Sequence, residues 1–248
     1  MSGSQLALVQ QVLTGARADV GDPLAAGSRP PRARGTESDI SADWRFALLE
    51  LKTFAPDAAC AAAVIAAYEV GQCDPWCAAA LLEAIGHPDG YTTALEILRL
   101  APGALAESYA GPALVRMRGA DALDDLAAIL ENDKLPQRAH EGAAFGLAAM
   151  SDPRADDVLL RAVDSGRIRS SIAGSVASER GIPAARLISW LRGADSRRRN
   201  LAAWTVYHLA AQGPLLKELG IAMHAALADA PLPFTAAQRN ELRDRLAN

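Results

Sequence analysis

Apolar positions in this chain follow a helical pattern that short polar turns interrupt at regular intervals. Runs rich in alanine and leucine end in such turns, and a new apolar run follows each one. With Gly86, Arg118, Ser151, Gly181 and Gly213 as markers of the turns, the successive steps are 32, 33, 30 and 32 residues. A repeat of this size is typical of arrays of helix pairs that bury their apolar sides against one another. The pattern therefore predicts an all-α solenoid.

The apolar runs predict about six helix pairs, which are 57–85, 91–117, 121–150, 153–179, 183–211 and 214–247. The single helices are expected near 57–70, 75–85, 91–100, 103–117, 121–131, 136–150, 153–164, 168–179, 183–192, 196–211, 214–228 and 235–247. Segments 1–54 and 214–247 would close the two ends of the array. A solenoid presents a long surface, so the expected role is binding.

Several predicted helices begin with a local start signal. Asp57 stands where a capping side chain is expected, and Asp74-Pro75 and Asp152-Pro153 combine an N-cap acceptor with a proline at the first helical position. Thr235 and Gln238 have the spacing of a capping box. These signals agree with the apolar pattern on where the helices begin.

The N-terminal part of the chain has a different composition. Residues 1–16 are expected to hold a short amphipathic helix, and residues 17–40 combine glycines, prolines and arginines with little apolar surface. Such a stretch cannot offset its ordering entropy by burial, which predicts a flexible linker. The solenoid would then span 41–248, and we expect the first helix to dock on it.

Composition narrows the class of protein. Half of the residues are hydrophobic, only 5% are aromatic, and the formal net charge of -4 argues against a general polyanion binder. No run approaches about 18 uninterrupted apolar residues, so no membrane span is expected. The first residues lack an export signal, and the three cysteines have no framework spacing. These features predict a cytoplasmic protein.

One stretch resembles a known repeat. The run His140–Ala155 (HEGAAFGLAAMSDPRA), followed by Leu159, Leu160, Ala162 and Val163, has paired alanines, a Leu-Gly-like step, an Asp-Pro turn and a second apolar helix. It is similar to the HEAT-like repeat named after the phycobiliprotein lyases, and residues 79–99, 172–191 and 201–223 match more loosely. The resemblance implies a right-handed α–α superhelix over roughly 57–228. The arginine that usually begins the second helix of this repeat is replaced by His140.

No residue pattern predicts catalysis or a cofactor. The chain lacks a nucleotide-binding glycine motif, a nucleophile elbow and a zinc-protease helix, and its four histidines lie in different repeats. Cys60, Cys73, Cys77 and His87 could form a zinc site, although three buried thiols in the core are the favoured interpretation. We therefore predict no catalytic residues, no cofactor and no metal.

Charge is unevenly distributed along the chain. Residues 166–200 hold eight arginines and two acids, a net charge of 8 − 2 = +6, whereas residues 102–133 hold two arginines and six acids, 2 − 6 = −4. Such a separation can steer a partner of matching polarity, although a solvated surface is an equally valid interpretation.

In HEAT-like arrays the second helix of each pair usually lines the concave face, so the resemblance places a binding surface there. Tyrosine, tryptophan and arginine dominate interface energetics. The candidate partner-binding residues on these helices are Arg138, His140, Glu141, Arg169, Arg197, Arg198, Trp204, Tyr207 and His208. For Trp204, a place in the core is an alternative.

Three functions remain open at this stage. The first is a non-enzymatic module that binds another protein, for example an immunity-type inhibitor of a bacterial toxin, by analogy of fold. The second is a nucleic-acid partner, as for HEAT-like DNA-binding proteins or alkylated-base DNA glycosylases. The third, suggested by the name of the repeat, is a lyase or chaperone for bilin chromophores.

Overall fold

The computed structural model describes residues 2–20, 46–102, 106–229 and 231–247, and the regular structure in these ranges is entirely helical. The chain divides into two compact units, residues 1–122 and 123–248. Each unit is described by itself below.

The first unit begins with α1 (Ser2–Val20) and a short helical stretch at 46–51. Its remaining helices are α3 (Ala58–Glu69), α4 (Pro75–Ile85), the 3-10 turn η2 (Pro88–Gly90), α5 (Tyr91–Leu100), α6 (Ala106–Arg118) and the 3-10 turn η3 (Gly119–Ala122). Helix α1 packs against α3 and α4, as expected for a docked first helix. Val9 and Val12 are fully buried, and the Gln5 side chain donates to the Ala55 carbonyl at 3.0 Å.

The second unit contains α7 (Leu123–Glu131), α8 (Gln137–Ala149), α9 (Arg154–Asp164), α10 (Ser170–Glu179), α11 (Ala184–Arg192), α12 (Ser196–Gln212), α13 (Lys217–Asp229) and α14 (Ala236–Ala247). The helices expected from residue 57 onward are confirmed to within about three residues at each described end. The first helix reaches Val20, so it includes four residues that were assigned to the linker. The rest of the predicted linker lies outside the described residues.

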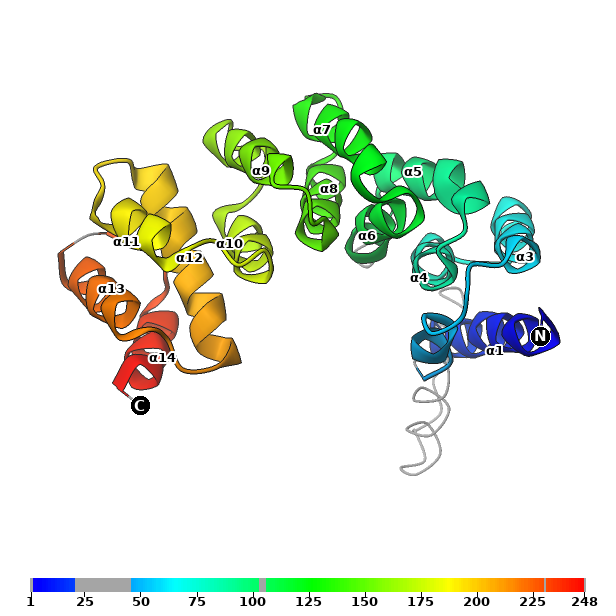
Figure 1. Cartoon of the computed structure of the whole chain (residues 1–248), viewed down its shortest axis with the longest axis horizontal. Coiled ribbons are helices and arrows are strands. Elements are labelled where there is room, and N and C mark those ends of the chain that lie inside the picture. The colour runs from blue at the N-terminus through cyan, green and yellow to red at the C-terminus, as the bar shows by residue number, and fades with distance from the viewer. Residues whose placement is uncertain (1, 21–45, 103–105, 230, 248) are drawn as a thin grey trace, which may run out of the picture. The chain divides into compact units, whose positions relative to one another are not determined.

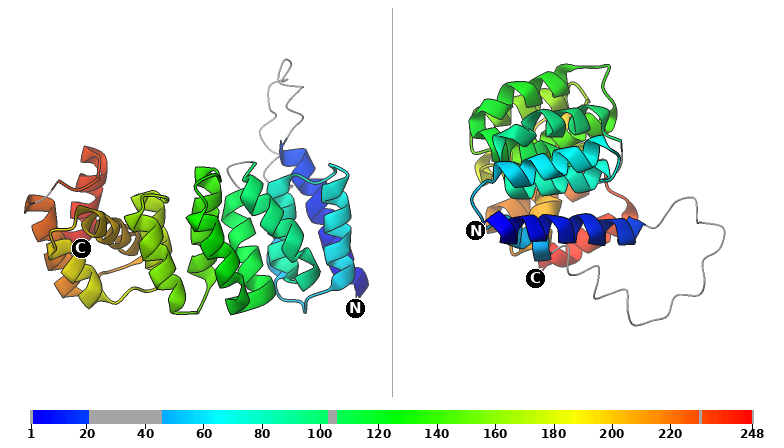
Figure 2. Two further views of the ribbon diagram at one scale, coloured as in Figure 1. Left: turned by 90° about the horizontal axis from the view of Figure 1, so that it is seen from above. Right: turned by 90° about the vertical axis from the view of Figure 1, so that its right-hand side faces the viewer.

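Helices pack both within pairs and between second helices of neighbouring pairs. In the first unit α3 contacts α4, α5 contacts α6, and α4 contacts α6. In the second unit α8 contacts α10, and α10 in turn contacts α12. Figure 1 shows α7 and α9 in one layer with α8 and α10 in the other, and the left view of Figure 2 shows the helices of this region running roughly parallel to one another.

Small residues allow the second helices to approach closely. A Cβ atom on Gly174 of α10 would lie 2.4 Å from Trp204 Cβ and 2.8 Å from the Trp204 carbonyl carbon. Only glycine fits this crossing of α10 and α12 without a shift of backbone. In the first unit α4 has the same position in its pair, and it buries an almost continuous apolar run from Cys77 to Leu82.

The helix ends explain the repeated turns. Gly86 after α4 and Gly181 after α10 have φ of +67° and +69°, a conformation that favours glycine. The Asp57 cap is confirmed, since its side chain accepts from the Cys60 amide at 2.9 Å, and Thr235 and Gln238 form the predicted capping box. At α4 the proline is at the first position as predicted, but the Asp74 side chain makes no capping hydrogen bond.

Candidate functional site

All nine candidate partner-binding residues lie in the second unit, where they form three separate groups rather than one site. One group joins α8 to the start of α10, one lies at the start of α12, and one packs between α12 and α14. Their environments differ in burial and in hydrogen bonding.

The first group contains Arg138, His140, Glu141 and Arg169. Arg138 is exposed and has no partner among the described residues. His140 is only 5% exposed and bonds through Nε2 to the Asn132 carbonyl at 3.0 Å, while its Nδ1 is buried without a hydrogen bond in the described structure. The His140 ring therefore stabilises the α7–α8 turn through its hydrogen bond to Asn132. It is buried, so it is not an exposed binding residue.

A bidentate ion pair links α8 to the N-terminus of α10. Arg169 Nε lies 2.5 Å from Glu141 Oε1, and Arg169 Nη2 lies 2.8 Å from Oε2. The Glu141 side chain is 4% exposed, whereas the Arg169 side chain is 66% exposed. Because an unpaired buried carboxylate is costly, this arginine stabilises the junction between two helix pairs.

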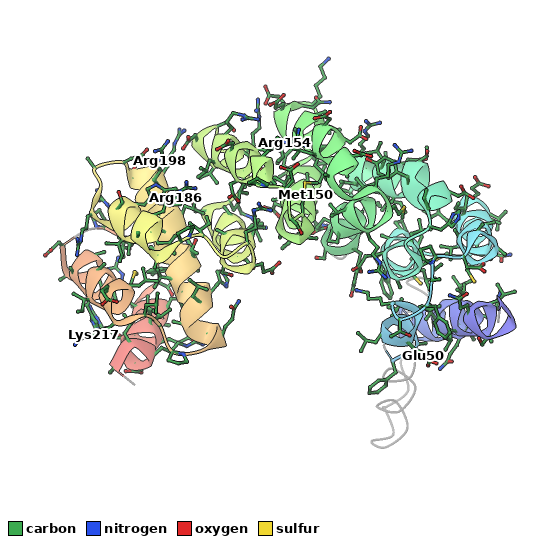
Figure 3. All side chains as sticks on the ribbon, viewed as in Figure 1. Glu50, Met150, Arg154, Arg186, Arg198 and Lys217 are labelled. Atoms are coloured by element: carbon green, nitrogen blue, oxygen red, sulfur yellow. The ribbon has the colours of Figure 1, made fainter. Side chains whose placement is uncertain are left out.

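The second group lies at the start of α12, where Asp195 is the N-cap. Its carboxylate accepts from the amides of Arg197 at 2.9 Å and Arg198 at 3.3 Å. Arg198 also reaches Asp164, with Nη2 3.8 Å from Oδ2, and it projects from α12 in Figure 3. The Arg197 side chain is exposed and has no partner in the part of the chain that is described.

The third group is an aromatic cluster. The Trp204 ring meets Phe234 edge-on at a centroid distance of 4.8 Å and Tyr207 at 5.5 Å, and His208 lies 6.1 Å away. Each of the three candidate side chains is partly buried. The core alternative for Trp204 fits this packing, because edge-to-face aromatic contacts stabilise a helix interface.

Tyr207 also anchors α14. Its hydroxyl donates to Glu241 Oε2 at 2.5 Å, and Arg245 pairs with Glu241 Oε1 at 2.5 Å. The hydrogen bond to Glu241 raises the pKa of Tyr207 above its ordinary value, because the acceptor is negatively charged. This network ties the last helix to α12.

Four of the eight arginines in segment 166–200 pair with described acids that precede the segment: Arg167 with Asp133, Arg169 with Glu141, Arg180 with Asp156, and Arg198 with Asp164. Arg180 is the clearest case: its side chain is 6% exposed, pairs with Asp156 at 2.5 Å and donates to the carbonyls of Leu147, Met150 and Asp152. Met150 lies in the α8–α9 turn, which Figure 3 labels. Arg167 similarly meets Asp133 at 2.9 Å.

Sequence reasoning missed these partners because they lie outside the segment in which charge was counted. The sequence did contain a signal for some of these contacts. Several ion pairs and hydrogen bonds between side chains, called ties below, join residues that are about one repeat length apart. The separations are 34 residues for Arg167 and Asp133, 34 for Tyr207 and Glu241, and 31 for the ion pair of Lys52 with Glu83 in the first unit. Opposite charges one repeat apart would have pointed to the pair of Arg167 with Asp133, whereas Arg180 and Asp156 are only 24 residues apart.

An open apolar groove was also not predicted. It has a volume of about 490 Å³ and lies where the α10–α11 turn, the end of α12 and the α12–α13 connection meet. Leu187 and Leu209 form part of its lining, and Leu216 at its border is 64% exposed. No charged side chain lines it.

The cysteines do not gather into a metal site in the described residues. Cys60, Cys73 and Cys77 are all buried, and no disulfide joins them there. Burial, together with the nearby Asp57 carboxylate, raises the pKa of the Cys60 thiol to about 11. Cys60 is only 1% exposed and therefore belongs to the core, in line with the favoured interpretation of the sequence.

The chain has no match among family models, curated proteins or solved structures. None of the helices within the described ranges combines the length and the apolar character that crossing a bilayer requires. The fold and the contacts above are therefore the basis for the functional proposal.

Proposed function

We propose that this protein is a non-enzymatic protein-binding module built as a right-handed HEAT-like solenoid. Two observations support the array: second helices of neighbouring pairs contact one another, and side-chain ties recur at about one repeat length. Arrays of this kind present an extended surface to partners. The sequence resemblance of residues 140–163 to HEAT-like repeats agrees with this architecture.

The observation that carries the proposal is that some arginines of the second unit stabilise the fold and others do not. Arg180 and Arg169 hold helix pairs together. Arg138 and Arg197 are exposed, pair with no described side chain, and lie near the beginnings of the second helices α8 and α12. Arginines that do not stabilise the fold are available to a partner, and arginine is enriched in binding hot spots.

A bacterial immunity-type inhibitor is the concrete version that we propose, working in the cytoplasm against a protein toxin. This part rests on analogy between folds. Cationic side chains near the beginnings of α8 and α12 would favour a toxin surface rich in carboxylates and speed its capture.

The test is capture of a protein partner by the full chain, followed by reconstitution from purified components. Calorimetry should give a stoichiometric complex, and hydrogen exchange should show protection on α8, α10 and α12. The Arg138→Glu variant should weaken the complex about tenfold, whereas Arg186→Glu, at an exposed position on α11, should leave it unchanged. Failure to reconstitute any protein complex would refute the proposal.

A further inference from the structure

Three turns of the second unit lie side by side and form one charged edge. This turn edge comprises residues 131–141, 161–169 and 192–199. Gln137 Nε2 donates to the Arg167 carbonyl at 2.6 Å, and Arg167 pairs with Asp133, which join the first two turns. Arg198 reaches Asp164 at 3.8 Å, which joins the third turn to the second.

The turn edge carries more cations than acids. Its nine cationic residues are Lys134, Arg138, Arg161, Arg167, Arg169, Arg192, Arg197, Arg198 and Arg199. Its five acidic residues are Glu131, Asp133, Glu141, Asp164 and Asp195. The difference is 9 − 5 = +4, on a chain whose formal net charge is -4.

Every acid of the edge already has an arginine partner. Besides Asp133, Glu141 and Asp164 as described, Glu131 lies 3.9 Å from Arg161, and Asp195 lies 3.6 Å from Arg198. Arg199 donates to the Gly193 carbonyl at the end of α11.

Four exposed cations remain without a partner among the described residues: Lys134, Arg138, Arg192 and Arg197. The turn edge therefore carries excess positive charge that is not paired with acidic side chains of the described residues.

We infer that the turn edge binds an acidic protein segment in extended conformation. This inference rests on the proposed function and names the chemistry of the partner. Neighbouring helices pack about 10 Å apart, and an extended chain advances about 3.3 Å per residue. Carboxylates at every third residue would therefore meet successive turns of the edge.

A protein segment fits the edge better than a nucleic acid does. The five carboxylates of the edge belong to the same three turns as the unpaired cations, so they interrupt the positive charge that a continuous phosphate backbone would need. A peptide can place its carboxylates beside the cations and neutral side chains beside the acids. The net negative charge of the chain further disfavours a polyanion.

The test measures binding of fluorescent 15-residue peptides to the full chain by anisotropy at low salt. The first peptide carries a glutamate at every third position, the second carries glutamine there, and the third has the same number of glutamates clustered at one end. We expect the spaced acidic peptide to bind about tenfold or more tightly than either control, with binding weakened by added salt. Equal binding of the spaced and glutamine peptides would overturn the inference.

Two charge-matched variants locate the binding. Arg138→Glu/Arg192→Glu/Arg197→Glu should reduce affinity for the spaced peptide by about tenfold or more. The control Arg186→Glu/Lys217→Glu/Arg243→Glu changes net charge equally at exposed cations outside the edge and should have little effect. Circular dichroism confirms that both variants fold. Equal losses in both variants would overturn the inference.

A 15-nucleotide DNA, single-stranded and duplex, is the last probe. Tighter binding of DNA than of the spaced peptide, lost in the edge variant, would replace the inference with nucleic-acid binding. If the edge variant still forms the reconstituted protein complex with full affinity, the edge inference and the expected effect of Arg138→Glu both fail, whereas protein binding itself, the proposed function, stands. If the spaced peptide binds the edge but no protein complex can be reconstituted, the proposed function fails instead.

Discussion

The two units stabilise equivalent helices by different means. In the first unit α4 is buried along most of its length, with Leu81 and Leu82 fully covered. In the second unit α10 buries a narrower strip of small residues, and the arginines at its two ends, Arg169 and Arg180, reach back to the preceding helix pair. Apolar burial therefore dominates one helix, and directed polar contacts add to it at the other.

This difference shows that helices at equivalent places in a repeat can be stabilised either by apolar burial or by polar contacts while the repeat keeps its spacing. Burial depends on area and tolerates small shifts, whereas a buried arginine demands particular acceptors. The second unit should therefore be more sensitive to single polar substitutions. Five predictions test this comparison.

Loss of the Arg180 side chain should have the largest effect. Arg180→Ala removes the pairing with Asp156 and three hydrogen bonds to carbonyls, so we expect a loss of about 4 kcal/mol in the free energy of unfolding. Urea denaturation measures the loss, and hydrogen exchange should place it in residues 123–248. The exposed Arg186→Ala is the control. A loss below about 1 kcal/mol would remove the contrast between the units.

In the first unit a core truncation should act through burial alone. Leu82 is fully buried in α4, so Leu82→Ala should cost about 3 kcal/mol through lost burial and the cavity that remains. The control is Leu100→Ala at the end of α5, where the side chain is 59% exposed and the cost should be small. Similar urea midpoints for the two variants would contradict the assignment of α4 to the core.

Variants of the Glu141–Arg169 ion pair can distinguish the cost of a buried charge from the cost of lost packing. Arg169→Ala leaves a buried carboxylate without its described partner, and we expect a loss of about 2 kcal/mol because the arginine itself is largely exposed. Adding Glu141→Gln should recover part of this loss, since the neutral amide is cheaper to bury. No recovery in the double variant would show that the carboxylate charge is not the cause.

The close crossing of α10 and α12 should resist even one methyl group. Gly174→Ala places a Cβ against Trp204, and we expect a net loss of about 1–2 kcal/mol although alanine is the better helix former. Gly220→Ala on α13, where the nearest atom lies 3.9 Å from the added Cβ, is the matched control and should be neutral or stabilising. Thermal unfolding distinguishes the two.

The smallest expected effect concerns Tyr207. Tyr207→Phe removes the hydrogen bond to Glu241 and should cost about 1 kcal/mol. Because the folded pKa of Tyr207 is raised, its contribution is complete below the ordinary value of about 10 and is lost as pH rises through the folded value. The stability difference between wild type and variant should therefore shrink above pH 10. A constant difference up to higher pH would contradict the raised pKa of Tyr207.

The helices were predictable because their signals are local. Alanine and leucine runs, the glycines at positions 86 and 181, and the Thr235–Gln238 capping box act within a few residues, and each has the expected geometry. Asp74 shows the limit, since a residue of the right type at an N-cap makes no capping bond.

The candidate site was less predictable because it depends on which charges meet in space. The net charge of segment 166–200 omitted Asp133, Glu141 and Asp156, which lie before the segment in the chain and pair with its arginines. His140 was ranked with exposed binding residues, but its ring is buried under a turn. Burial and pairing are properties of the packed helices, and no single segment encodes them.

The one-repeat spacing of the ties has a consequence for how the length of this protein can change during evolution. Arg167 and Tyr207 each reach a residue 34 positions away, and Lys52 reaches one 31 positions away. Duplication of a whole helix pair would preserve the spacing between the two members of each tie. An insertion of a few residues inside a helix would instead rotate one member of a tie away from the other. Natural length variants should therefore differ by whole pairs.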